Sequence, residues 1–146
     1  MNNKEYDSFA KKKFPKSPIV KDTAMAFLVG GSICLIGQFI INFCISKGMQ
    51  FEDASTIASC SLIFLSALLT GLNIYGKIAK HAGAGTLVPI TGFANAIAAP
   101  AIEFKSEGFI LGLGAKMFVI AGPVIVYGVA SSVIAGIITY IMEVFL

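Results

Sequence analysis

Long apolar runs separated by short polar segments dominate the sequence after its first 22 residues. Residues 24–45 contain no charged side chain, and a helix of that length crosses the roughly 30 Å hydrocarbon core of a bilayer. Residues 55–76 form a second run of the same kind. The pattern predicts two membrane-spanning helices that are joined by the short polar loop 46–54.

The C-terminal run is too long for one simple span. Residues 109–146 contain only two charged side chains, Lys116 and Glu143. One straight helix of this length would measure about 57 Å, which exceeds the thickness of a bilayer. Gly122-Pro123 is the obvious helix break. We therefore expect a short helix over about 108–121 and a full span over about 123–144.

The stretch 81–108, between the second and the last run, does not read as a simple span. Thr86 is a candidate N-cap for a helix over about 87–102, with Pro89 in its first turn. Such a helix measures about 24 Å, so we expect it to enter from the inner side and to reach deep. Together with Gly83-Ala84-Gly85 it gives a broken, small-residue backbone, which is where membrane proteins tend to build substrate pathways.

Composition supports an integral membrane protein. The chain is 56% hydrophobic and 13% charged, whereas soluble domains are roughly 25% charged. The predicted class is all-α, with about three full spans plus a short broken or re-entrant helical pair. The expected organisation is a lysine-rich tail over 1–22 and one helical membrane domain over 23–146.

The distribution of charge predicts the orientation. Six of the eleven cations precede the first apolar run: Lys4, Lys11, Lys12, Lys13, Lys16 and Lys21. Positive flanks stay in the cytoplasm, so we expect the tail inside, the loop 46–54 outside, and Lys77 and Lys80 inside. The lipid bilayer, and not nucleic acid, is the expected partner of these charges. The C-terminus would lie inside if 87–102 crosses the membrane, and outside if 87–121 is a re-entrant hairpin.

Chemistry of an enzymatic or metal-binding kind is poorly represented. Cys34, Cys44 and Cys60 lie inside apolar segments without C-x-x-C spacing, and His81 is the only histidine. The sequence offers no nucleophile–base pair, metal cluster or phosphate loop. We expect neither an enzyme nor a cofactor.

Gln38, Asn42 and Lys116 are polar side chains inside predicted membrane segments that need a partner or water. Gln38 and Asn42 share one helix face, and amides in a membrane helix should point into protein or water. They either bond neighbouring helices or line a pathway. Lys116 either extends to the membrane interface or provides a cation that faces a pathway for an anion.

Four segments give the chain a family resemblance: AFLVGGSICLIGQ (26–38), SALLTGLNIYGKI (66–78), AGAGTLVPITGFANAI (82–97) and EFKSEGFILGLGAKMF (103–118). They resemble the SpoVAC/SpoVAEB family of sporulation membrane proteins. The sequence motifs TGFAN and EFKSEG favour its AC branch over its AEb branch. The similarity extends from Ala26 to about Ser131.

The resemblance implies a channel or transport subunit for dipicolinic acid, with calcium, in the inner membrane of the forespore and spore. It implies uptake into the developing spore, release during germination, and assembly as an oligomer or with SpoVA subunits of the AD and AEb types. A non-conducting scaffold subunit is the alternative. The candidate pathway residues are Gly83, Gly85, Thr91, Gly92 and Asn95, then Lys116, Gln38 and Asn42.

Overall fold

The computed structural model describes residue 6 and residues 18–145, so most of the expected N-terminal tail lies outside the described residues. The elements in chain order are helices α2 (Ile19–Ser46), α3 (Phe51–Gly71) and α4 (Tyr75–Ala82), the 3₁₀ turn η1 (Gly83–Leu87), helix α5 (Pro89–Glu103), the 3₁₀ turn η2 (Lys105–Glu107), the π-helical turn η3 (Phe109–Gly114) and helix α6 (Ala115–Phe145).

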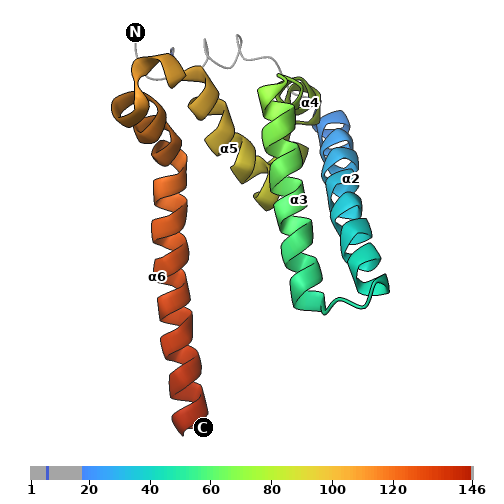
Figure 1. The fold of residues 1–146 in the computed structure, drawn as a ribbon, viewed down its shortest axis with the longest axis vertical. Helices are drawn as coiled ribbons and strands as arrows, with labels where there is room; N and C mark the ends of the chain where they lie inside the picture. Colours follow the sequence, from blue (N-terminus) through green and yellow to red (C-terminus); the bar gives the residue numbers. More distant parts are fainter. Residues whose placement is uncertain (1–5, 7–17, 146) are drawn as a thin grey trace.

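The all-α membrane class is confirmed for the described residues. Three segments are long and apolar enough to cross a membrane, namely Ile19–Ser46, Phe51–Gly71 and Phe109–Val144. Helices α2 and α3 form an antiparallel pair joined at the lower end of Figure 1. Gly37 permits their close approach, since a Cβ atom at this position would lie 3.2 Å from Leu62 Cδ1.

The segment from α4 to α5 enters and leaves the bundle at the same end. Helix α4 lies across the upper end of α2 and α3, η1 then descends, and α5 climbs back to that end (Figure 1). Ser66 bonds to Thr91, and Thr70 bonds to Asn95, so residue numbers rise together along α3 and α5. The two helices are therefore parallel, and residues 75–103 form a re-entrant hairpin.

The tip of this hairpin lies well inside the membrane domain. Leu87 and Pro89, which flank the tip, line one apolar groove with Ser59 and Ile63 of α3. Ile63 is eight residues before the end of α3 at Gly71, which places the tip about 12 Å below that end.

Two expectations for this region are wrong. Helix α5 does not enter from the inner side, because η1 makes the descent and α5 leads back out. Thr86 does not cap α5, because the N-cap position belongs to Val88 and the Thr86 hydroxyl donates to the Gly83 carbonyl at 3.0 Å. Pro89 does occupy the first turn, where its missing N–H leaves no bond unmade.

The expected helix break at Gly122-Pro123 is also wrong, because α6 is continuous from Ala115 to Phe145. Gly122 has no Cβ to clash with the proline ring, which removes part of the strain. Pro123 has no backbone N–H, so the continuous helix lacks one hydrogen bond. Unwinding the helix in lipid would leave several backbone groups without partners, which costs more free energy.

The real break precedes α6, at residues 104–114. Gly108 has a φ of +98°, which L side chains rarely adopt. At Gly112 a Cβ atom would lie 2.7 Å from the Phe104 carbonyl oxygen, so only glycine fits in this turn. The turn reverses the chain and sends α6 downward beside the other helices, past the level of the α2–α3 loop (Figure 1).

Charge assigns the two ends of the described chain to sides of the membrane. The α4 end carries Lys21, Lys77, Lys80, Lys105 and Lys116 against three carboxylates, whereas the opposite end carries Lys47 against Glu52, Asp53 and Glu143. The positive-inside rule predicts that the α4 end is cytoplasmic. With a re-entrant hairpin and three crossing segments, we then expect the end of α6 on the outer side.

Candidate functional site

The re-entrant hairpin is held to α3 by side chains that are buried between the two helices. The Ser66 hydroxyl is 1% exposed and donates to the Thr91 carbonyl oxygen at 2.6 Å. One turn further on, Thr70 Oγ1 lies 2.9 Å from Asn95 Oδ1 and 2.7 Å from the Ser66 carbonyl oxygen. These contacts explain the polar face of α3, because hydroxyls and an amide satisfy one another where lipid offers no partner.

Glycine lets the descending arm of the hairpin touch α2 and α5 backbone to backbone. A Cβ atom at Gly85 would lie 2.5 Å from the Ala26 carbonyl oxygen. A Cβ atom at Gly92 would lie 2.9 Å from the Thr86 carbonyl oxygen. Gly83 has a φ of +51° and ends α4, so it turns the chain downward. The three glycines therefore have distinct structural roles in building the hairpin.

Tyr75 is a site residue that was not predicted from the sequence. It is 4% exposed, and its hydroxyl donates to the Thr86 carbonyl oxygen at 2.8 Å. This bond connects the start of α4 to η1. A tyrosine carries no local signal that distinguishes such a buried bond from a place at the membrane interface.

A cavity of about 380 Å³ lies between α2, α3 and the hairpin, and five hydroxyl residues are among those that line it: Ser32, Ser66, Tyr75, Thr86 and Thr91. Each of these hydroxyls donates to a backbone carbonyl group. Four of these protons are donated to carbonyl groups of the hairpin, and the fifth, from Ser32, to Leu28 within α2, so none is directed at the cavity.

The structure brings five of the eight candidate residues together. Gly83, Gly85, Thr91, Gly92 and Asn95 all belong to the hairpin. The other three candidate residues lie elsewhere.

Lys116 lies in the first turn of α6, with Nζ 4.5 Å from the centroid of the Phe104 ring. Gln38 and Asn42 lie on an exposed face of α2 and bond to each other at 2.9 Å. One chain therefore does not gather all eight residues along a single line.

A polar hollow of about 530 Å³ lies at the mouth of the hairpin, at the α4 end of the domain. It is lined by side chains from the start of α2 and from α4, including Asp22, Lys80 and His81, and it reaches Gly83. Lys77 lies on the same short helix, whose exposed surface is basic. A cluster of cations at a membrane mouth raises the local concentration of small anions.

The described residues define a polytopic helical membrane protein with a re-entrant hairpin. A family model described as SpoVAC/SpoVAEB sporulation membrane protein matches residues 22–138. This chain therefore belongs to the SpoVAC/SpoVAEB family of sporulation membrane proteins.

Among known proteins, the chain is 48% identical over 139 residues to stage V sporulation protein AC of Bacillus subtilis (strain 168). The match covers 94% of this chain and 93% of that relative. No solved structure matches the chain.

Proposed function

We propose that this protein is a channel or transport subunit for dipicolinic acid, with calcium, in the inner membrane of the forespore and spore. The observation that carries the proposal is the re-entrant hairpin of residues 75–103. A hairpin whose tip stops inside the membrane domain is an element from which membrane proteins build pathways, because its irregular backbone is tolerated only against protein or water.

Dipicolinic acid is proposed as the transported molecule from the family resemblance, and the charges at the mouth of the hairpin are compatible with it. Dipicolinate is a small dianion. Lys80 and His81 line the hollow that reaches Gly83, together with Asp22, and Lys77 lies on the same helix α4. Asn95 lies further along the hairpin and offers an amide. Lysines at the mouth and an amide NH2 group within the hairpin are groups that can bind an anion.

A scaffold subunit without conduction is the second candidate. The hydroxyls of Ser66 and Tyr75 donate to hairpin carbonyls, and Thr70 bonds to Asn95, so these polar groups hold helices together. On this account the chain supports a pathway that other SpoVA subunits, of the AD and AEb types, complete.

Flux through reconstituted vesicles tests the proposal. Purified protein, alone and then with AD-type and AEb-type subunits, is placed in vesicles loaded with dipicolinate, and release is followed by the luminescence of its terbium complex. Release above that of empty vesicles, by the chain alone or in the complex, is the expected result. A complex that releases dipicolinate equally well without this chain would contradict the proposal.

Two matched pairs of variants separate channel from scaffold. Asn95→Ala and Thr70→Val both break the bond between α3 and α5, but only Asn95→Ala removes the amide. A pathway role predicts that Asn95→Ala lowers flux more than Thr70→Val does, whereas a scaffold role predicts equal effects. The second pair is Lys116→Ala and Lys105→Ala, where Lys105 is an exposed lysine at the same end. A pathway role predicts that Lys116→Ala lowers flux more than Lys105→Ala does, whereas a scaffold role predicts equal effects.

A further inference from the structure

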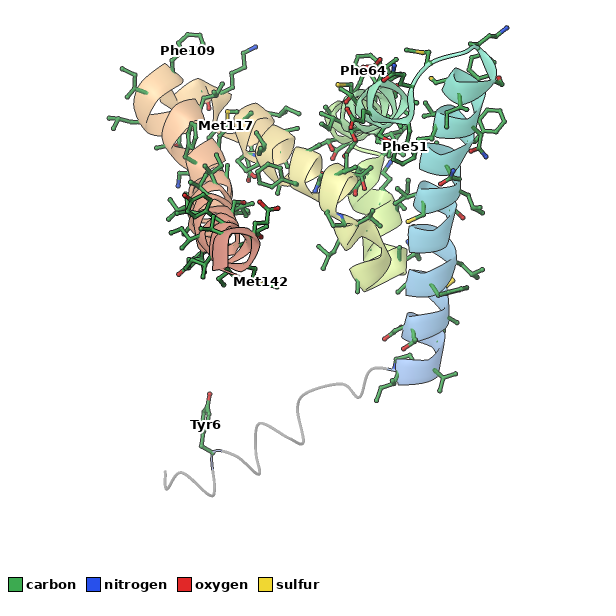
Figure 2. All side chains as sticks on the ribbon, turned by 90° about the horizontal axis from the view of Figure 1, so that it is seen from below. Tyr6, Phe51, Phe64, Phe109, Met117 and Met142 are labelled. Atoms are coloured by element: carbon green, nitrogen blue, oxygen red, sulfur yellow. The ribbon has the colours of Figure 1, made fainter. Side chains whose placement is uncertain are left out.

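Helix α2 has an exposed face that no part of the described chain covers. Its residues recur at alternating spacings of three and four: Leu28, Gly31, Leu35, Gln38, Asn42 and Ile45. We call this set the outer seam of α2. Leu28 and Leu35 are 61% and 72% exposed, and a Cβ atom at Gly31 would meet nothing within 4 Å. Figure 2 shows side chains along the side of α2 that is turned away from the other helices.

The spacing of the outer seam is that of a left-handed helix pair. Positions that alternate by three and four residues form the a and d positions of a heptad, and most helix pairs in membranes cross with this geometry. The buried residues of α2, Gly37 and Cys44, do not belong to the seam. The helix therefore uses one face within the chain and keeps a second face of helix-packing form.

Two amides lie in the middle of this apolar seam. Gln38 Nε2 donates to Asn42 Oδ1 at 2.9 Å, and both side chains are exposed. The side-chain oxygen of Gln38, Oε1, and both side-chain amide hydrogens of Asn42 have no hydrogen-bond partner among the described residues. Gln38 lies eight residues before the end of α2 at Ser46, about 12 Å from the outer end. At that depth, lipid cannot satisfy these groups.

The seam also contains a ready-made hole for a side chain. A shallow hollow of about 480 Å³ on the outside of α2 is lined by Leu35, Ile36, Gln38, Phe39 and Asn42. Four of these, at positions 35, 38, 39 and 42, have the spacing of the four residues that surround one knob in a coiled coil. In a parallel pair, the d-position knob that enters this hole is residue 38 of the other helix.

We propose that α2 pairs in parallel with α2 of a second copy of this chain, with Gln38 and Asn42 bonded across the interface. All copies insert with the same orientation, so a two-fold axis normal to the membrane brings each residue to its own counterpart. Amides carry both donors and acceptors, so Gln38 of one copy can bond to Gln38 and Asn42 of the other. A second copy supplies matching amides at the required depth, which neither lipid nor an apolar helix does. This helix pairing does not depend on whether dipicolinic acid is the transported molecule.

Cross-linking of the full-length protein in vesicles tests the contact. In a background of Cys34→Ser, Cys44→Ala and Cys60→Ser, Leu35→Cys lies on the seam and Ile36→Cys is an exposed position beside it. Oxidation should give covalent dimers at least several times faster for Leu35→Cys than for Ile36→Cys. Equal rates at the two positions would overturn the proposal.

The role of the two amides in self-association is tested by diluting labelled protein with lipid. Energy transfer between labelled copies should show that Gln38→Leu with Asn42→Leu weakens self-association about tenfold. The matched control is Gln38→Asn with Asn42→Gln, which keeps two amides and should retain most of the association. Undiminished association of the leucine variant, or pairing that occurs only with another membrane protein present, would show that α2 does not pair with its own copy.

Discussion

The hydroxyl of Ser66 donates a 2.6 Å hydrogen bond to the backbone carbonyl oxygen of Thr91. Twenty-five residues separate the two, and the bond joins α3 to the first turns of α5. Because Ser66 is 1% exposed, nothing larger than a hydroxyl fits between the helices at this point. The contact sets how closely the re-entrant hairpin lies against α3.

Replacement of Ser66 should destabilise the hairpin, either by loss of the hydrogen bond or by the size of the new side chain. Ser66→Ala removes one interhelical bond and should cost about 0.5–1.5 kcal/mol of unfolding free energy in a detergent titration. Ser66→Leu should cost more, because overpacking forces the helices apart. Ser59→Ala is the control, since its hydroxyl donates to the Ser55 carbonyl within α3. Equal loss for Ser59→Ala and Ser66→Ala would contradict the role of this contact.

Gly85→Ala should destabilise the hairpin more than any other glycine-to-alanine change in α4 or η1. Its Cβ atom would lie 2.5 Å from the carbonyl oxygen and 2.8 Å from the Cα atom of Ala26, which are backbone atoms that cannot rotate away. We expect a loss of about 1–3 kcal/mol in the same titration. Gly76→Ala is the matched control, because its Cβ atom would meet nothing within 4 Å and alanine favours a helix.

Ala26→Gly separates backbone contact from side-chain contact at this position. The atoms of Ala26 nearest to Gly85 belong to its backbone, so Ala26→Gly should not rescue Gly85→Ala. Recovery of stability in the double variant would show that the two segments meet through the methyl group, contrary to the structure.

Hydrophobic patterning was sufficient to predict the helical membrane class and the long helices α2 and α3, because a span needs a certain length of apolar sequence. It did not predict the direction of α5. That direction depends on Ser66 and Thr91, which are far apart in the sequence and carry no local signal. The short amphipathic helix α4 was missed because its eight residues are fewer than a reliable periodic pattern requires.

The candidate site was predictable only as a segment. The glycines and prolines of residues 81–108 indicated a broken backbone, and the hairpin confirms that break. Helical periodicity showed that Gln38 and Asn42 share a face, but both faces of α2 are apolar. Only the packing of α3 and η1 decides which face the rest of the chain covers, so the outward direction of these amides could not be read from the sequence.

The contact between Lys116 and Phe104 should stabilise the turn before α6. The Lys116 ammonium group lies 4.5 Å from the centroid of the Phe104 ring. Phe104→Leu removes the ring and should cost about 0.5–1 kcal/mol of unfolding free energy, whereas Phe104→Tyr retains the attraction and should cost less.

A pathway role for Lys116 predicts that Phe104→Tyr leaves dipicolinate flux unchanged while Lys116→Ala lowers it. If Phe104→Leu and Phe104→Tyr unfold alike, the ring does not hold the lysine.

The structure predicts opposite sides of the membrane for the turn η2 and the end of α6. In the cysteine-free background, Ser106→Cys should react with a membrane-impermeant maleimide only from the cytoplasmic side. Gln50→Cys, in the α2–α3 loop, should react only from the other side, and Val144→Cys should behave like Gln50→Cys. The physical reason is that the hairpin returns to its own side and α6 then crosses once, which leaves five lysines of residues 18–145 inside and one outside. Labelling of Val144→Cys from the same side as Ser106→Cys would mean that residues 75–103 cross the membrane, and the re-entrant hairpin would then be wrong.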